Sequence, residues 1–354
     1  MAAPLDINLF VFNGAETVGA AIDSVRAQTW RDFTLTIIDD GSTDGSAEIA
    51  AARAAGDPRI RLMRRQRNLG AVASFQHAFR HGEAPFVMPK SADDLLAPDF
   101  VERLMAVLAA HPDCAMCHAA GAVFTDRSPP RPYPPDHCLH ATGADPLARA
   151  AHVMRRYTSS PAFWGIYRRA AVECLSPIPY RAGWDHVLLA ELALFGEIRH
   201  VPEVLYLRRD GGKPVGRLAR AATAQVRAGH EADDPLGDPR WRTPLITTAF
   251  AHIEIFATAR LPLADRRALI EQVPALFRAR WLPHLRQEAA LLHADAPALV
   301  AAVQAAEDAE AHWTAQNLLG ALHASEAIVP EIKLAPLRLE LESVIAGASG
   351  RAAD

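Results

Sequence analysis

Residues 33–45 read FTLTIIDDGSTDG, an apolar run that stops abruptly at two carboxylates and a glycine-containing turn. The run from Phe33 to Ile38 is rich in β-branched side chains, which is typical of a buried strand. Asp39, Asp40 and the residues after them favour a loop. The stretch therefore predicts a strand that leads directly into an acidic loop.

The same alternation of strand and helix signals continues on both sides of this stretch. Apolar residues recur at helical spacing, and short apolar runs separate the helical segments. The sequence predicts strands over residues 7–12, 33–38, 59–63 and 85–88, and helices over residues 15–28, 44–55, 70–81 and 98–112. Repeated strand–helix units of this size indicate an α/β fold with a mostly parallel sheet and helices on both faces.

Three acidic positions follow predicted strands or begin a helix: Asp39-Asp40, Asp93-Asp94 and Asp185. In an open parallel sheet, ligands bind outside the carboxyl ends of the strands. Taken alone, each position also has a purely structural explanation. Asp39-Asp40 could belong to a turn, Asp93-Asp94 could form the cap before Pro98, and Asp185 could be the N-cap of a helix. Carboxylates gathered at one edge repel one another unless a cation or hydrogen-bond donors join them. Their convergence therefore favours a binding site.

A set of motifs in a fixed order makes the interpretation more specific. The motifs are FNGAE (12–16), SVRAQT (24–29), IDDGSTDG (38–45), NLG (68–70), DDLLAP (93–98), GWDHVLLAELALFG (183–196) and VPEVLYLRR (201–209). In this order and spacing they resemble the family-2 glycosyltransferases, which have the GT-A fold. The resemblance implies a Rossmann-like, mostly parallel mixed sheet flanked by helices, and the transfer of a sugar from a nucleotide-sugar donor.

The resemblance also implies which residues bind the nucleotide. Asp40 would hold the base, most often uracil, through its N3–H group. Phe10, Asn13 and Glu16 would line the same pocket. Asp93 would face the ribose and the diphosphate.

Two further carboxylates would carry the chemistry that the resemblance implies. Asp94 would coordinate the Mg²⁺ or Mn²⁺ ion that bridges the two phosphates and offsets the charge of the leaving group. Asp185 would be the general base that takes the proton of the acceptor hydroxyl in an inverting transfer. No covalent intermediate is then required, so no nucleophilic Ser or Cys is expected.

Further candidates for donor or acceptor contacts are Trp164, Trp184, Arg208 and Arg209. Trp164 either stacks on an acceptor sugar or packs in the core, and the sequence leaves both readings open. Many relatives carry a His one or two positions after the Arg pair, whereas Asp210-Gly211-Gly212 follows it here. This departure puts a third metal ligand in doubt. It also motivates the rival hypothesis of a glycosyltransferase-like nucleotide-binding or scaffold protein without catalysis.

The pattern of the chain changes after the last motif. Residues 1–214 are predicted to form the GT-A domain, and residues 215–354 an Ala-rich helical region in which strand signals vanish. Within the first region, residues 127–147 are rich in proline, with Pro129, Pro130, Pro132, Pro134 and Pro135, and predict a surface loop.

Two Cys- and His-containing segments allow alternatives. Cys114-Ala-Met-Cys117-His118 has haem-attachment spacing, but it stands where the next buried strand belongs, so buried free cysteines are favoured. A zinc site with His137, Cys138 and His140 is disfavoured because the Pro-rich segment separates the two groups.

Composition excludes several classes of protein. Lys and Arg number 37 against 41 Asp and Glu, so no basic excess points to nucleic acid. Four Cys in 354 residues do not make a disulfide framework, and no run is long and apolar enough for a transmembrane helix. Residues 13–19 lack the Gly-x-Gly-x-x-Gly turn of a dinucleotide-binding oxidoreductase.

These observations predict a cytoplasmic protein. Its expected partners are a nucleotide-sugar donor and a glycan or lipid-linked glycan acceptor. The absence of a Lys or Arg before the first apolar run argues against a secretory signal. A peripheral contact with the inner face of a membrane and a homodimer are alternatives that the sequence leaves open.

Overall fold

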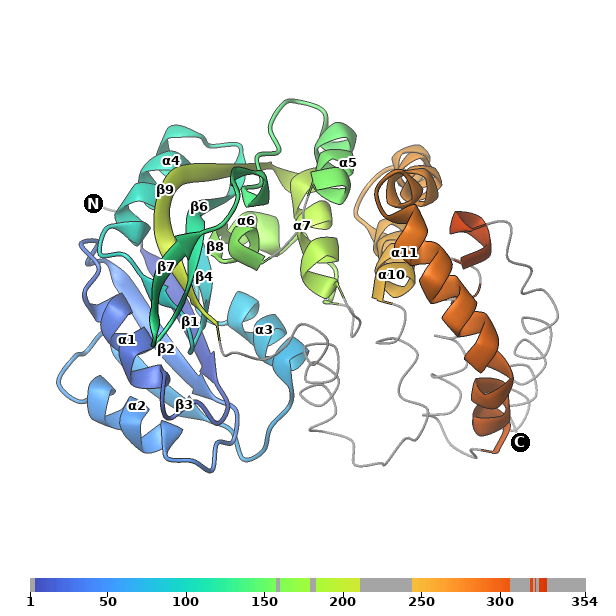
Figure 1. Ribbon diagram of the computed structural model, residues 1–354. Helices are drawn as coiled ribbons and strands as arrows, with labels where there is room; N and C mark the ends of the chain where they lie inside the picture. Colours follow the sequence, from blue (N-terminus) through green and yellow to red (C-terminus); the bar gives the residue numbers. More distant parts are fainter. Residues whose placement is uncertain are drawn as a thin grey trace, which may run out of the picture. The chain divides into compact units, whose positions relative to one another are not determined.

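The computed structural model describes residues 4–156, 160–178, 183–210 and 244–305, with residues 319, 320, 322 and 325–329 near the C-terminus. Within these residues, one sheet has its strands in the order β3-β2-β1-β4-β8-β6-β9-β5, and β7 pairs with β6 (Figure 1). The strands are β1 (Leu5–Val11), β2 (Phe33–Asp39), β3 (Ile60–Arg64), β4 (Phe86–Ser91), β5 (Leu95–Leu96), β6 (Cys114–Thr125), β7 (Ser128–Pro132), β8 (Gly165–Arg168) and β9 (Glu197–Arg209).

The first part of the sheet is parallel. Strand β1 pairs with β2 and β4, and β2 pairs with β3, all in parallel register. The helices that connect these strands and lead to the next are α1 (Val18–Arg26), α2 (Ser46–Ala54), α3 (Ala71–Arg80) and α4 (Phe100–Ala110). The apolar face of α1 is buried as its spacing predicts. The α/β fold class is therefore confirmed.

The second part of the sheet is mixed, but it returns to the same direction. Strand β8 is antiparallel to both β4 and β6, and β6 is parallel to β9. Two reversals cancel, so the carboxyl ends of β6 and β9 lie at the same edge of the sheet as the carboxyl end of β4. The short strand β5 then pairs antiparallel with the end of β9.

The Pro-rich segment 127–147 is more ordered than the sequence predicts. Instead of one surface loop it contains β7, the 3-10 helix η1 (Pro135–His137) and the start of α5 (Pro146–Arg156). Every residue of β7 is exposed, and the strand pairs only with β6 among the described residues. Proline is compatible with such a strand because an edge position does not need every N–H donor.

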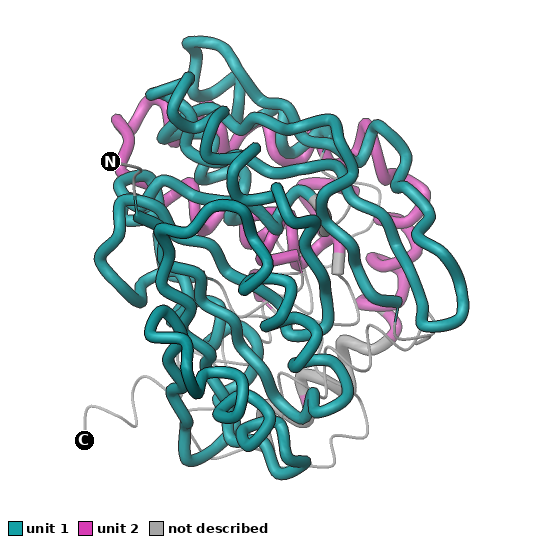
Figure 2. Tube along the Cα trace, turned by 90° about the vertical axis from the view of Figure 1, so that its left-hand side faces the viewer, with its two compact units in different colours: residues 1–178, 188–231 teal, residues 179–187, 232–354 magenta. Residues whose placement is uncertain are grey.

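The chain divides into two compact units (Figure 2). Unit 1 comprises Met1–Ile178 and Leu188–Glu231, and unit 2 comprises Pro179–Val187 and Ala232–Asp354. Besides the sheet and its helices, unit 1 contains η2 (Ser160–Phe163) and α6 (Arg169–Val172). Helix α7 (Trp184–Phe195) belongs to both units, because its first four residues are part of unit 2 and the rest are part of unit 1. The domain boundary predicted at residue 214 lies outside the described residues.

The described part of unit 2 beyond residue 243 is helical, as expected for an appended helical region. It contains α10 (Pro244–Thr258) and the long helix α11 (Leu263–Ala305). Helix α11 is interrupted at Trp281, two residues before Pro283, and a proline inside a helix removes a backbone donor and clashes with the preceding turn. No described helix combines the length and the apolar character that crossing a bilayer requires.

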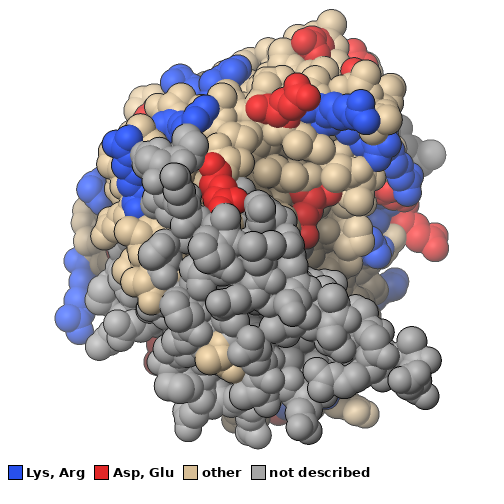
Figure 3. Space-filling model, turned by 90° about the vertical axis from the view of Figure 1, so that its right-hand side faces the viewer, with Lys and Arg blue, Asp and Glu red and all other residues tan. Residues whose placement is uncertain are grey.

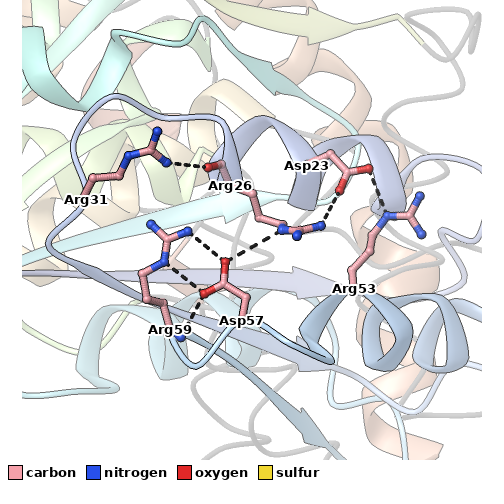
Figure 4. Close-up of polar contacts among 6 residues, drawn as sticks. All are labelled: Asp23, Arg26, Arg31, Arg53, Asp57 and Arg59. Carbon is pink, nitrogen blue, oxygen red and sulfur yellow. Dashed lines mark hydrogen bonds and ion pairs between the residues drawn. The ribbon is translucent and has the colours of Figure 1, made fainter.

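Charged side chains of both signs lie on the surface. On the face drawn in Figure 3, Lys and Arg side chains lie among Asp and Glu side chains. Figure 4 shows one such group, in which Asp23 binds Arg26 and Arg53 at 3.5 and 3.1 Å. In the same group, Asp57 binds Arg59 at 2.8 Å, and this hydrogen-bonded pairing lowers the pKa of Asp57 to about 2. The group ties α1 to α2 and to the start of β3.

The N-terminus of α10 is held by a buried carboxylate. Glu288 of α11 accepts hydrogen bonds from the N–H groups of Leu245 and Ile246, at 2.9 and 3.0 Å. These N–H groups have no partner inside their own helix. Burial raises the pKa of Glu288 to about 7.

The raised pKa of Glu288 predicts how stability depends on pH. Because the folded state prefers the protonated side chain, the Glu288 contribution is present below pH 4.5 and is lost as the pH rises to 7. The glutamine side chain of the variant does not titrate, so only the wild type loses this contribution. We therefore expect the unfolding free energy of Glu288→Gln, relative to that of the wild type, to rise by up to about 3 kcal/mol between these pH values. Urea unfolding at both pH values measures this, and parallel curves for the two proteins would contradict it.

Candidate functional site

The loops that follow β1 and β2 are joined by side-chain hydrogen bonds at the carboxyl edge of the sheet. The Asn13 N–H donates to Ser42 Oγ at 3.0 Å, and the Thr43 N–H donates to Asn13 Oδ1 at 2.9 Å. The Ala15 N–H donates to Asp44 Oδ2 at 3.0 Å. Two segments of the predicted motifs, 12–16 and 38–45, therefore form one structural unit.

Gly41 explains why the acidic loop contains a glycine. Its φ angle is +77°, a conformation that side chains with a Cβ rarely adopt. A Cβ at this position would also stand 2.9 Å from the backbone of Arg67. The loop after β2 can therefore pack directly on the segment that precedes α3.

The Asp40 carboxylate anchors that neighbouring segment. Asp40 is 3% exposed and accepts hydrogen bonds from Arg65 Nη1 at 2.8 Å and from Ser74 Oγ at 3.0 Å. The Leu69 N–H lies 3.2 Å from both oxygens. Three donors thus share a group that offers about four acceptor positions.

Asp93 joins the loop after β4 to the loop after β1. Thr17 donates its hydroxyl to Asp93 Oδ1 at 3.0 Å, while the Asp93 side chain remains exposed. Asn13 and Glu16 are exposed in the same loop as Thr17. The structure therefore brings the predicted residues Asn13, Glu16, Asp40 and Asp93 to one edge of the sheet.

Asp94 is buried and is held by two residues of β9. It is 5% exposed, its Oδ2 accepts the hydroxyl of Tyr206, and its Oδ1 accepts the Arg209 N–H at 2.9 Å. Burial raises the pKa of Asp94, and the charge of Lys90 and the Tyr206 hydrogen bond oppose that rise. Burial, together with the Asp94 charge, raises the pKa of Tyr206, so its hydroxyl stays a donor.

Lys90 is a functional candidate that the sequence interpretation missed. Its side chain is fully buried, and Nζ donates to the carbonyl oxygens of Ser91 and Asp94, both at 2.6 Å. Burial lowers the pKa of Lys90 to about 8, against the opposing pull of Asp94 and Asp93. The available signal was a lone lysine in the strand directly before two aspartates.

A cluster of aromatic side chains connects Phe10 to Asp94. The rings of Phe10 and Trp164 stack with centroids 6.3 Å apart, and those of Trp164 and Tyr206 with centroids 6.1 Å apart. Phe75 packs edge-on against Phe10 at 4.4 Å. Trp164 is partly buried against the hydrophobic core, so its core role is observed, and its contact with an acceptor sugar stays a prediction.

The remaining predicted residues occupy separate places. Arg208 donates from Nη1 to the hydroxyl of Tyr133 at 3.2 Å. Trp184 and Asp185 belong to unit 2, and both are half-buried. Helix α7 begins at Trp184, so Asp185 lies inside the first turn and not at the N-cap that the sequence predicted. An acidic side chain is still favourable there because of the helix dipole.

The Cys and His segments meet in space although the sequence separates them. His118 Nε2 lies 2.9 Å from the carbonyl oxygen of Leu139, and the rings of His140 and His200 are 5.3 Å apart. Cys114 and Cys117 are buried free thiols in β6. Among the described residues, no three His, Cys, Asp or Glu side chains form a group able to hold a metal ion.

A hollow lies beside the end of β9. It has a volume of about 470 Å³, and its walls are the β6–β7 hairpin and one residue after β9. Its lining residues are Val123, Phe124, Thr125, Ser128, Pro129, Pro130, Arg131, Pro132 and Asp210. Phe124 pairs in register with Arg209, and the Arg209 N–H binds Asp94. The hollow therefore adjoins the loop that carries Asp93 and Asp94.

Comparison with known families agrees with this geometry. Residues 7–170 match the model described as Glycosyl transferase family 2. This part of the chain is therefore similar to the family-2 glycosyltransferases. The match contains β1 to β4 and the loops that carry Asp40, Asp93 and Asp94.

The similar proteins share only part of their length with this chain. It is 30% identical over 186 residues to the uncharacterized glycosyltransferase YibD of Escherichia coli (strain K12), which is 51% of this chain and 53% of YibD. It is 31% identical over 102 residues to the putative glycosyltransferase EpsE of Bacillus subtilis (strain 168), covering 28% of this chain and 37% of EpsE. It is 33% identical over 106 residues to the succinoglycan biosynthesis protein ExoU of Rhizobium meliloti (strain 1021), covering 29% and 31%. The chain thus spans about half the length of YibD and about a third of the other two.

A solved structure resembles the whole fold. The crystal structure of S. aureus TarS 1-349 in complex with UDP-GlcNAc superposes with a TM-score of 0.58, covering 97% of this chain and 92% of TarS 1-349. The two sequences are 14% identical, so the likeness is one of fold. It supports the GT-A fold that the sequence predicts.

The buried contact between Tyr206 and Asp94 predicts a measurable cost of mutation for the stability of unit 1. Tyr206→Phe removes a donor from a buried carboxylate, and we expect a loss of about 1.5–3 kcal/mol in unfolding free energy. The matched control is Tyr167→Phe, whose hydroxyl donates to the neutral carbonyl of Phe163, with an expected loss of about 0.5–1.5 kcal/mol. Urea unfolding measures both, and equal losses would show that the Asp94 contact has no special strength.

Proposed function

We propose that this chain transfers a sugar from a nucleoside-diphosphate donor to a glycan hydroxyl with inversion at the anomeric carbon. The observation that carries the proposal is the convergence of Asp40, Asp93 and Asp94 at one edge of a sheet, in the part of the chain that is similar to the family-2 glycosyltransferases. Ligands of open α/β sheets bind at that edge. The bond that forms joins the acceptor oxygen to the anomeric carbon, and the bond that breaks releases the nucleoside diphosphate.

The nucleotide base would lie against Phe10 and Asp40. Three donors of the chain already share the two oxygens of Asp40, so the N3–H of uracil would share or displace one of these contacts. Phe10 is part-buried beside Phe75 and Trp164, so an aromatic surface stands near this position. Asp93, which is exposed, would face the ribose and diphosphate.

The donor set at Asp93 and Asp94 fits Mg²⁺ or Mn²⁺. These ions prefer oxygen ligands, and Mg²⁺ commonly binds one or two carboxylates and completes its shell with phosphates and water. Each oxygen of Asp94 accepts one hydrogen bond, which leaves each oxygen a lone pair. Asp94 would hold the ion with the help of the diphosphate, and the ion would offset the negative charge of the leaving group.

Asp185 would act as the general base. Its place in the first turn of α7 favours the ionised carboxylate, which can accept the proton of the attacking hydroxyl. A carboxylate stabilised in this way is only a moderate base, so correct positioning has to supply most of the rate effect.

The acceptor would be a sugar of a growing cell-surface glycan. The name of ExoU supports this class, because ExoU is a succinoglycan biosynthesis protein. The hollow beside β7 adjoins the acidic loop and offers proline and aromatic faces to such a sugar. We propose a cytoplasmic protein that works on a glycan or lipid-linked glycan at the inner face of the membrane.

Nucleotide binding provides the first test. We expect UDP to raise the melting temperature, and Mn²⁺ to increase this shift, because a ligand that binds only the folded state stabilises it. Asp94→Asn should abolish the Mn²⁺ increment, whereas uridine, which lacks the phosphates, should bind equally with and without Mn²⁺.

The same experiment separates the alternatives. Binding of GDP or dTDP without binding of UDP would overturn the uracil assignment, and a chelator without effect would overturn the metal assignment. Release of nucleoside diphosphate from a panel of sugar donors measures turnover. Clear binding with no turnover on any donor would favour the non-catalytic binding protein.

The base is tested by Asp185→Asn, which keeps the size of the side chain. We expect turnover to fall by ~10²–10⁴-fold with UDP affinity and melting temperature nearly unchanged. The matched control is Asp265→Asn, since Asp265 also lies in the first turn of a unit 2 helix. An unchanged rate would remove Asp185 from the mechanism, and a large loss of stability with little loss of rate would assign it a structural role.

A further inference from the structure

Arg209 is a partly exposed cation that contacts the loop of Asp93 and Asp94. It is the last residue of β9, and its N–H binds Asp94 Oδ1 at 2.9 Å. Its Nε donates to the carbonyl oxygen of Asp93 at 3.2 Å. Its guanidinium lies over the ring of Phe124, with the central carbon 4.8 Å from the ring centroid. Backbone and side chain together fix this cation beside Asp93 and Asp94.

The partner of the Arg209 guanidinium is a carboxylate on a surface turn. Nη1 forms an ion pair with Asp126, which stands in the turn between β6 and β7. The side chain of Arg209 is 15% exposed and that of Asp126 is 79% exposed. The Arg is thus fixed in the structure, whereas the Asp reaches it from solvent.

Energetics make this ion pair easy to replace. An exposed carboxylate gains little from an ion pair, because water solvates it well in the unpaired state. A guanidinium has five N–H donors, and within the described part of the chain only Nε and Nη1 of Arg209 have acceptors. A diphosphate carries more charge than one carboxylate and can bind a guanidinium through two parallel hydrogen bonds.

We propose that Arg209 binds the diphosphate of the donor, and that Asp126 is a counter-ion which the diphosphate displaces. This inference rests on the proposed function for the identity of the donor, but the anion site itself does not require a nucleotide. It gives the chain a fixed cation at the leaving group, where the sequence has Asp210-Gly211-Gly212 and no His after the Arg pair. Asp126 keeps the charge of Arg209 balanced while no ligand is bound.

The proposal predicts opposite effects for the two partners. We expect Arg209→Gln to weaken binding of pyrophosphate and of UDP by about 10-fold or more, because a charge-assisted contact is lost. We expect Asp126→Asn to strengthen both by about 2- to 5-fold, because the competing carboxylate is gone. Uridine, which has no phosphate, should bind all variants equally. Calorimetry in the presence of a chelator measures these affinities without any contribution from metal.

Two controls make the effect specific. Glu203→Gln removes the acidic partner of Arg103, an exposed arginine at a different position, and should leave pyrophosphate binding unchanged. In the double variant Arg209→Gln with Asp126→Asn, the gain from Asp126→Asn should disappear, since the two residues act on one site. High salt should shrink the gain from Asp126→Asn as well.

The outcomes separate this inference from the proposed function. Pyrophosphate binding that is absent, or that neither variant changes, overturns the role of Arg209. Weakening by Asp126→Asn would show that Asp126 helps to hold the anion site and would overturn its role as a displaced counter-ion. Pyrophosphate binding with the predicted pattern but without UDP binding would support this inference and would contradict the uridine donor.

Discussion

A buried carboxylate has to be paired, and unit 1 meets that requirement at Asp94. An unpaired charge in the interior costs several kcal/mol, so the fold must bring donors to it. The donors come from β9, more than a hundred residues further along the chain, through the Tyr206 hydroxyl and the Arg209 N–H. The pairing of β5 with β9 holds these residues in register with Asp94. The loop that carries Asp93 and Asp94 therefore depends on β9 as much as on β4, the strand that precedes it.

The candidate site is assembled from segments that lie far apart in the sequence. The loops after β1, β2 and β4 are joined to one another through Asn13, Asp44 and Thr17. The aromatic cluster of Phe10, Trp164 and Tyr206 then connects the predicted base pocket to Asp94. The first strands alone would leave the Asp94 carboxylate without its partners.

Two cationic side chains lie close to the loop of Asp93 and Asp94, one buried and one near the surface. Lys90 is fully buried and holds the carbonyl groups of Ser91 and Asp94. Arg209 stands at the surface edge of the same loop and is balanced by Asp126. A departing diphosphate gains negative charge, and fixed cations near it need no reorganisation when that charge develops. In the proposed function, these two residues would supply positive charge close to the leaving group.

The sequence by itself determined the alternation of strands and helices, because buried strands and amphipathic helices have different hydrophobic periods. It also determined the acidic loops at Asp40 and Asp94, since loops after parallel strands fall at one edge. It did not reveal that the prolines of residues 128–132 pair as an edge strand, because pairing depends on an exposed neighbour in space. Nor did it reveal the partners of Asp94 or the ion pair between Arg209 and Asp126. Long-range contacts of this kind leave no local pattern, so the tertiary structure alone decided which charges meet.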